Sequence, residues 1–187
     1  AVESPVDNVW IAPATVDLSG AEVELVSVLA RETRLKVALD GAADEFDYIL
    51  LDSPPSLGLL TVNCLTAADA VLIPIQCEYY ALEGLGQLRN TLSLLRRMLN
   101  PDLDVLGVVL TMYDVRTRLS AEVADEVRKH FAGRVFQSVI PRSVRLSEAP
   151  IYGQPIISYA PESRGAEAYT ELAREVIQIG ETQGDQV

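Results

Sequence analysis

Runs of consecutive apolar residues, most of them closed by an aspartate or a proline, constrain the fold of this chain most strongly. They occupy residues 46–52, 70–76, 104–114 and 134–142, and a shorter run lies at 9–15. Because the apolar character is continuous and does not alternate, the runs predict strands that are buried on both faces. Such strands belong in a mostly parallel sheet covered by helices, so the predicted class is α/β. The polar residues at the strand ends are expected to line one common crevice.

Segments with helical spacing of apolar residues separate these runs. Ser19 and Glu22 form a capping-box sequence, which predicts a helix continuing toward Leu39. A later helix is capped by Ser120 or a neighbour and ends at Gly133. Other segments predict helices at 57–69, 85–99 and 163–179, a possible short strand at 156–159, and a polar, frayed tail from about residue 180 to 187. The whole chain, residues 1–187, is expected to form a single domain.

Composition excludes several classes of protein. The formal net charge of -12 argues against attraction to nucleic acid over the whole surface, although a local basic patch remains compatible with it. Cys64, Cys77 and His130 lack the spacing of a zinc or iron-sulfur site. No apolar run approaches the roughly 20 residues that span a bilayer, and the first ten residues do not resemble a signal peptide. A soluble, cytoplasmic protein without membrane contact is expected.

The stretch FDYILLDSPPS, residues 46–56, raises the question of what its aspartate does. Pro54 and Pro55 cannot donate to a sheet ladder, so the chain must leave the sheet there. Asp52 is thereby placed at the carboxyl end of a buried strand, where α/β proteins bind ligands. Taken alone, the aspartate either caps a turn or contacts a ligand.

The two lysines of the chain exclude one phosphate-binding motif. Lys36 follows Leu35 and Lys129 follows Arg128, so neither lies in a glycine-rich loop. No Gly-Lys-Ser/Thr sequence of a P-loop occurs.

A resemblance to a known family rests on several stretches that occur in the family's order. They are FDYILLDSPPSLGLLTVNCLTAAD, PIQCEYYALEGLGQL, LTMYDVRTRLSAEV and VIPRSVRLSEAPIYGQPI. They resemble the ParA/Soj chromosome- and plasmid-partitioning ATPases, deviant-Walker P-loop proteins related to MinD and the nitrogenase iron protein. The resemblance extends from about Val6 to Ile179. It implies a P-loop NTPase-like fold, ATP and Mg²⁺ as cofactors, an ATP-dependent homodimer, DNA binding without sequence preference at the nucleoid, and stimulation by a ParB-type centromere-binding protein.

The resemblance also implies roles for individual residues. Asp52 resembles the Walker B aspartate, which orders the shell of a nucleotide-bound magnesium ion. Met112, Pro141 and Arg142 match positions that surround the adenine in the family. Candidates for contacting DNA phosphates are the basic residues on the later helices and loops, foremost Arg145 and Arg164, and with them Arg116, Arg118, Arg128, Lys129 and Arg134.

Two family motifs have no counterpart in this sequence. The glycine-rich P-loop and the second motif with the catalytic aspartate both precede the family position of Val6. The chain therefore resembles the carboxyl-terminal two-thirds of a partition ATPase, no catalytic residue is assigned, and tight ATP binding by this chain alone is not expected. In the family's strand order, residues 46–52 would also lose their partners on both sides. We expect either an upstream segment or a rearranged pairing of this strand.

Three other functions are weighed against a partition ATPase. A MinD-like membrane-associating regulator calls for a basic amphipathic carboxyl-terminal helix, whereas REVIQIGETQGDQV is acidic and polar. An iron-sulfur reductase needs cysteines that bridge two subunits, and Cys64 and Cys77 lack that context. The chain as it stands is alternatively a non-enzymatic fragment.

Overall fold

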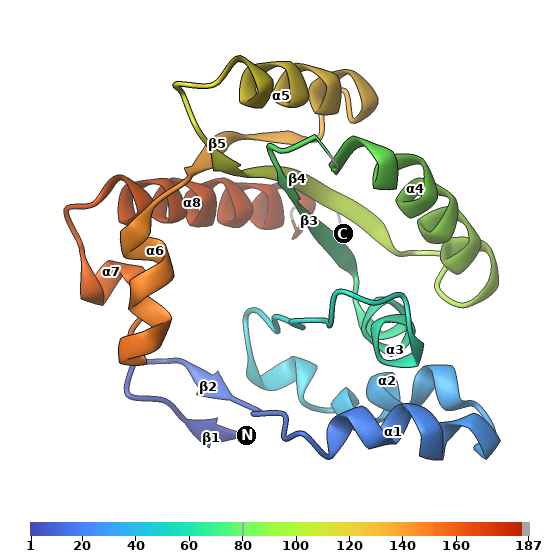
Figure 1. Cartoon of the computed structure of the whole chain (residues 1–187). Coiled ribbons are helices and arrows are strands. Elements are labelled where there is room, and N and C mark those ends of the chain that lie inside the picture. Colours follow the sequence, from blue (N-terminus) through green and yellow to red (C-terminus); the bar gives the residue numbers. More distant parts are fainter. Residues whose placement is uncertain (80, 185–187) are drawn as a thin grey trace. The chain divides into compact units, whose positions relative to one another are not determined.

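The computed structural model describes residues 1–79 and 81–184 of the chain, which divides into two compact units, Ala1–Ala68 and Asp69–Val187. The second unit contains a parallel three-stranded sheet with helices packed against it (Figure 1). The first contains short helices and a two-stranded antiparallel ribbon. The predicted α/β class is confirmed, and each unit is described by itself below.

The sheet of the second unit has the order β3-β4-β5. Its strands are β3 (Ala70–Gln76), β4 (Asp104–Tyr113) and β5 (Val135–Pro141), and both pairings are parallel. Parallel neighbours need a crossover, and the helices α4 (Ala81–Met98) and α5 (Arg118–His130) supply the two that are required here. The strands predicted at 70–76, 104–114 and 134–142 are thus confirmed.

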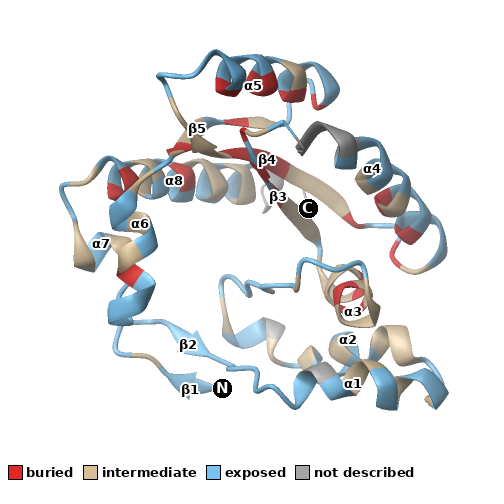
Figure 2. Ribbon diagram, viewed as in Figure 1, coloured by how far each residue is buried: buried red, intermediate tan, exposed pale blue. Residues whose placement is uncertain are grey.

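Helices cover both faces of this sheet. The long helix α8 (Arg164–Gly184) packs Leu172 against Val109, Phe136 and Ile140 of the sheet. Figure 1 shows α5 on the opposite side, and the apolar face of α5 is fully buried at Val127. In Figure 2 the buried positions of this unit gather on β4, β5 and the helix faces that meet them. The continuous apolar character of β4 follows from this burial on two sides.

Three short helical segments connect β5 to α8. They are α6 (Val144–Glu148), η4 (Ala149–Tyr152) and α7 (Ile156–Tyr159). The possible strand at 156–159 is wrong, because the carbonyl of Pro155 accepts hydrogen bonds from the amides of Ser158 and Tyr159 and closes a helical turn instead. α8 continues to Gly184, past its predicted end at Ile179, and residues 185–187 lie outside the described part of the chain.

The first unit begins with β1 (Val2–Glu3), which pairs antiparallel with β2 (Trp10–Ile11). Its helices are α1 (Leu18–Glu24), η1 (Leu25–Ser27), η2 (Arg31–Thr33), α2 (Arg34–Leu39), η3 (Ala43–Glu45) and α3 (Leu59–Ala67). The buried side chain of Asn63 holds α3 against its neighbours: it donates to the carbonyl of Arg31 at 2.8 Å and accepts from the amide of Leu35 at 3.1 Å.

The helix predicted from Ser19 toward Leu39 is interrupted. α1 starts at Leu18 with Asp17 as its N-cap, so Ser19 lies inside the helix and the predicted capping box is wrong. The Glu22 carboxylate instead accepts from the amide of Leu60, at the start of α3, at 3.4 Å. Ala30 adopts a left-handed backbone with φ of 52°, which ends any continuous helix before α2.

The strand predicted at 46–52 is also wrong. This segment is not part of any sheet within the described residues, and the side chains of Tyr48, Ile49 and Leu50 are 52%, 39% and 89% exposed. A strand needs a neighbour for its amides and carbonyls, and water supplies those partners when none is present. The rearranged pairing that we considered for this segment is therefore not observed.

None of the helices in residues 1–79 and 81–184 has both the length and the apolar character that crossing a bilayer requires.

Candidate functional site

The carboxyl ends of the three parallel strands form one polar edge of the second unit. The ladder continues one residue past the strand ends: the amide of Cys77 donates to the carbonyl of Thr111, and the amide of Arg142 donates to the carbonyl of Tyr113, both at 2.9 Å. The loops that follow β3, β4 and β5 thus leave the sheet side by side. This edge is where open α/β sheets bind their ligands, and we name it the carboxyl edge.

The three residues predicted to surround adenine gather at the carboxyl edge. Met112 is the penultimate residue of β4, Pro141 ends β5 opposite Tyr113, and Arg142 follows directly. Met112 has a φ of 54°, in the left-handed region that a methionine rarely adopts. The register between β4 and β5 shifts at the same place, between Leu110 and Tyr113. The strand end is therefore bent out of the regular ladder where the predicted contacts lie.

Two ion pairs stand at this edge. The guanidinium of Arg142 contacts the carboxylate of Glu78, and Arg116 contacts Asp114 through Nε at 2.9 Å and Nη2 at 2.7 Å. Hydrogen bonds from the Arg116 side chain and then from its backbone amide hold the pKa of Asp114 well below its usual range, and the charge of Arg142 adds to this effect. Asp114 is therefore ionised throughout the physiological pH range.

Hydroxyl groups fix the geometry behind these charges. Ser120 is 4% exposed; its hydroxyl donates to the carbonyl of Cys77 at 3.3 Å and accepts from the amide of Asp114 at 3.3 Å. The Thr117 hydroxyl caps α5 by accepting from the amide of Ser120. The loop after β3, the end of β4 and the start of α5 are thus joined through one serine. The helix cap that the sequence predicted at Ser120 or a neighbour is thus Thr117, three residues before Ser120.

Asp52 lies in the first unit, in the irregular segment before α3, and its side chain is exposed. The Thr61 hydroxyl of α3 lies 3.2 Å from the carbonyl of Pro54 and 2.5 Å from that of Ser56, so the loop after Asp52 is anchored to the helix. The described residues contain no group of three or more His, Cys, Asp or Glu side chains that would hold a metal by themselves. A single hard carboxylate fits Mg²⁺, which keeps most of its waters and takes further oxygens from phosphates.

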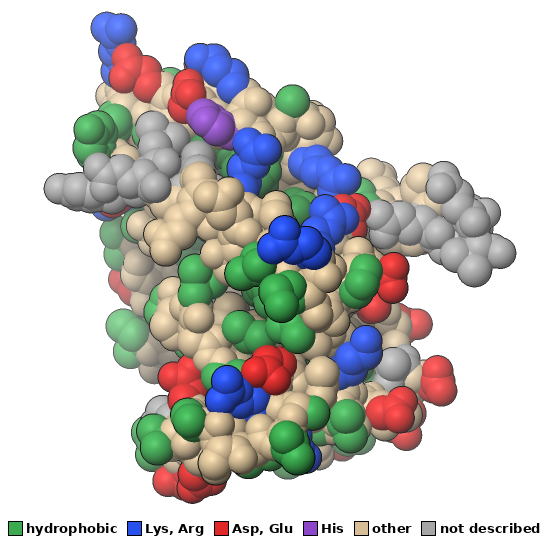
Figure 3. Space-filling model, turned by 90° about the vertical axis from the view of Figure 1, so that its right-hand side faces the viewer, with side chains coloured by type: hydrophobic (Ala, Val, Ile, Leu, Met, Phe, Trp, Pro, Cys, Tyr) green, Lys and Arg blue, Asp and Glu red, His purple; other side chains and the backbone are tan. Residues whose placement is uncertain are grey.

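The predicted DNA contacts carry acidic partners, with one exception. Figure 3 shows basic and acidic side chains side by side on one face of the molecule. The pairs beyond that of Arg116 are Arg118 with Glu122 at 2.7 Å, Arg128 with Asp125 at 3.3 Å, Lys129 with Glu126 at 3.1 Å, Arg134 with Asp104 at 2.7 Å and Arg145 with Glu148 at 3.0 Å. Within the described part of the chain, Arg164 is exposed at the start of α8 and makes no ion pair.

Arg134 does not join the carboxyl edge. It precedes β5, and its guanidinium contacts Asp104 and the carbonyl of Val105 at the start of β4. Arg96 reaches the same aspartate at 3.4 Å. These contacts tie the amino ends of β4 and β5 together, at the opposite end of the strands from Arg142 and Arg116.

Sequence reasoning missed Glu78, Asp114 and Ser120. The first two had a signal: Asp114 closes the apolar run at 104–114 and Glu78 follows the run at 70–76 by two residues, but only Asp52 was given an individual role. The role of Ser120 as a link between strand ends had no signal in the sequence, because it depends on the loop after β3 returning to α5.

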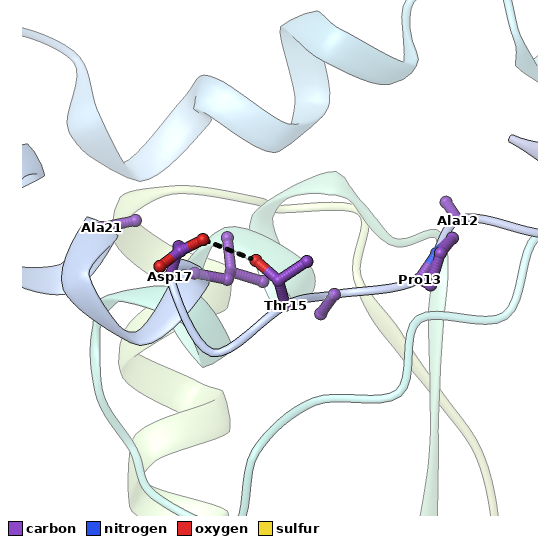
Figure 4. Close-up of a pocket in the computed structure, with 7 residues that line it drawn as sticks. Ala12, Pro13, Thr15, Asp17 and Ala21 are labelled. Atoms are coloured by element: carbon purple, nitrogen blue, oxygen red, sulfur yellow. Dashed lines mark hydrogen bonds between the residues drawn. The ribbon is translucent and has the colours of Figure 1, made fainter.

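A hollow in the first unit is separate from all predicted site residues. It is lined by Ala12, Pro13, Ala14, Thr15, Asp17, Leu18 and Ala21 (Figure 4). Its polar contact is a hydrogen bond of 3.4 Å from the Thr15 hydroxyl to the Asp17 carboxylate. Small apolar side chains dominate the lining, so no chemistry is assigned to it.

Comparisons with known proteins give the family. A family model described as an AAA domain matches residues 1–105. The cobyrinic acid a,c-diamide synthase of Mycobacterium smegmatis, solved with ADP and magnesium, is 40% identical with a TM-score of 0.73, over 87% of this chain and 59% of that one. MinD of Pyrococcus horikoshii, complexed with Mg-ADP, is 23% identical with a TM-score of 0.63. The match covers 78% of this chain and 56% of the MinD chain, and it shows a shared fold.

Curated relatives are closer in sequence. The sporulation initiation inhibitor protein Soj of Bacillus subtilis is 58% identical over 94% of this chain and 69% of its own length. The chromosome partitioning protein ParA of Myxococcus xanthus is 56% identical over 89% of this chain and 59% of its own length. The ParA protein of Caulobacter vibrioides is 51% identical over 95% of this chain and 67% of its own length. The chain thus spans between 59% and 69% of the length of these relatives. At this level of identity over nearly all of its residues, the chain belongs to the ParA/Soj family of chromosome-partitioning ATPases.

Proposed function

We propose that the protein is a ParA-type partitioning ATPase. It forms a homodimer with ATP, binds DNA without sequence preference at the nucleoid in the cytoplasm, and is stimulated by a ParB-type centromere-binding protein. The observation that carries this proposal is the carboxyl edge, where Met112, Pro141 and Arg142 meet beside two ion pairs. The names of the curated relatives support the same function.

Nucleotide binding is assigned to the carboxyl edge. The thioether of Met112 and the ring of Pro141 offer polarizable surfaces to a base, and adjacent backbone groups can read its edge. Arg142 is held by Glu78, which fixes the direction of its guanidinium. Magnesium, when bound, would neutralise the phosphate charge, and Asp52 would hold it through one carboxylate and its water shell. The related synthase was solved with ADP or an ATP analogue together with magnesium.

DNA binding is assigned to the basic residues near the end of β5 and on the later helices. Arg164 is available without breaking an ion pair inside the described residues. Arg145 shares the carboxylate of Glu148 with the hydroxyl of Tyr159, each at 3.0 Å, and must exchange it for a phosphate. Contacts of this kind read no sequence, which fits a protein that moves over the nucleoid.

The relatives favour this function over a MinD-like regulator. Soj and ParA proteins are more than 50% identical to the chain, whereas MinD is similar at 23% and shares the fold alone.

A DNA-binding experiment tests the proposal. The protein is expressed from the complete open reading frame and titrated, with Mg-ATP, into duplexes of unrelated sequence at several salt concentrations. Arg145→Ala combined with Arg164→Ala is expected to weaken binding to all sequences alike and to lower the salt slope by about 2, because two phosphate contacts are lost.

Arg174→Ala is the matched control. Arg174 lies on the same helix as Arg164 and pairs with Glu171, so its loss removes a positive charge without removing a proposed contact. The control should bind like the wild type. Unchanged binding by the double variant, or a loss confined to particular sequences, would contradict the assignment.

A further inference from the structure

The contact between Asp114 and Arg116 differs from the surface ion pairs on α5. Oδ1 of Asp114 accepts from Nε of Arg116 at 2.9 Å and from its backbone amide at 3.0 Å, and Oδ2 accepts from Nη2 at 2.7 Å. The two side-chain bonds occupy the Nε and Nη2 edge of the guanidinium. That edge is one of those with which arginine binds two oxygens of a phosphate.

The two partners differ in exposure. The Asp114 side chain is 15% exposed and that of Arg116 is 81% exposed. The backbone of Asp114 is fixed, because its amide donates to Ser120 and its carbonyl accepts from the amide and hydroxyl of Thr117, both at 3.1 Å. The carboxylate therefore stays where it is, whereas the arginine has free space in which to turn toward a ligand.

Ordinary surface pairs provide a contrast. On α5, Arg118, Arg128 and Lys129 meet glutamate or aspartate side chains that are 59%, 70% and 39% exposed. Such pairs are screened by water and salt, and they hold their cations weakly. The more sheltered carboxylate of Asp114 competes better for its arginine.

We propose that Asp114 is an internal competitor of DNA: its carboxylate occupies Arg116 and must release it before Arg116 can bind a phosphate. This inference rests on the proposed function, in which Arg116 is one of the DNA contacts. The acidic residue then sets how strongly the protein binds DNA without touching the DNA itself.

A second arginine acts on Asp114. The positive charge of Arg142 also lowers the pKa of Asp114, as the smallest of the causes, after the contacts with Arg116. Arg142 is in turn paired with Glu78 and belongs to the proposed nucleotide contacts. The release of Arg116 therefore occurs beside the residues that we assign to the nucleotide.

Asp114→Asn tests the competition. The amide oxygen of asparagine can still accept from the backbone amide of Arg116, so the turn is retained while the charged pair is lost. With Mg-ATP, the variant is expected to bind duplex DNA about two- to five-fold more tightly, as expected for the loss of a partly exposed ion pair. Its salt slope should be steeper, because in the wild type rising salt also weakens the competing ion pair and so offsets part of the loss of DNA affinity.

Two further variants separate this mechanism from a general gain of charge. Glu171→Gln removes one negative charge from the pair with Arg174, which is not a proposed contact, and should leave DNA binding unchanged. Asp114→Ser also keeps an oxygen near the backbone amide of Arg116 and serves as a second test should the asparagine variant fold poorly. In an Arg116→Ala background, Asp114→Asn should bring no gain.

The outcomes are distinct. Tighter binding and a steeper slope that both vanish without Arg116 support the competition. Weaker binding, binding equal to that of Glu171→Gln, or a gain that persists in Arg116→Ala overturns it and leaves the proposed function standing. A wild-type protein that binds no duplex even at low salt overturns the proposed function and this inference together.

Discussion

A glycine in β4 leaves room for an aromatic ring of β5. Gly107 lies buried in β4, and a Cβ built on it would stand 2.5 Å from Cε2 of Phe136, a core residue of β5. Glycine weakens a strand, so its presence here is explained by this close approach.

Gly107→Ala should therefore destabilise the protein. The aromatic ring is packed and cannot move freely, so we expect a loss of about 1–3 kcal/mol in the free energy of unfolding. Urea unfolding measures it. Gly86→Ala is the matched control, because no side chain among the described residues would meet its Cβ and alanine favours the helix; it should add about 0.5–1 kcal/mol. Equal effects of the two variants would contradict the packing argument.

At the residue scale, the sequence predicted part of the arrangement at the carboxyl edge. Met112, Pro141 and Arg142 were expected together, and the parallel register of β4 and β5 brings them together. The pair of Asp114 and Arg116 could not be foreseen, because it depends on a turn in which a side chain bonds to the amide two residues later. Composition and spacing do not specify such a turn.

At the scale of elements, α8 protects the outer edge of the sheet. The carboxylate of Glu175 accepts from the amides of Gln137 and Ser138 in β5, each at 2.7 Å, and also from the Ser138 hydroxyl. β5 is an edge strand, and unpaired amides at such an edge invite pairing with another chain.

Glu175→Gln should loosen this edge. The donors of Gln137 and Ser138 use both carboxylate oxygens of Glu175, and glutamine offers only one acceptor oxygen. We therefore expect a loss of about 1–2 kcal/mol in the free energy of unfolding. Glu171→Gln, on the same helix and in a surface pair, should change it by less than about 0.5 kcal/mol. Calorimetric or denaturant unfolding compares the two. A Glu175→Gln protein as stable as the control would show that the amides are satisfied without the carboxylate.

The sequence predicted the strands that have neighbouring strands and covering helices in the structure, and it failed for segments without them. The strands of the second unit agree with their apolar runs because neighbours and covering helices are there to bury them. The run at 46–52 has the same composition but lacks a pairing strand among the described residues, so composition alone gave the wrong state. The segment 156–159 forms a helical turn closed on the carbonyl of Pro155, which its apolar composition did not indicate.

At the scale of the whole molecule, the proposed functions are divided between the two compact units. Asp52, the proposed magnesium residue, belongs to the first, and the proposed nucleotide and DNA contacts belong to the second. In the proposed function DNA binding depends on ATP, so the proposed nucleotide contacts and the proposed DNA contacts are coupled in free energy.

The binding of duplex DNA by the complete gene product, measured with Mg-ATP and with Mg-ADP, tests the central claim most directly. We predict that ATP raises DNA affinity by about tenfold or more in the wild type. Asp47→Ala, which removes another exposed carboxylate from the segment that contains Asp52, should show the same rise in DNA affinity with ATP. Asp52→Ala should show no such rise. Affinity that is equal with ATP and ADP in the wild type, or an Asp52→Ala protein that responds like the wild type, would contradict the account.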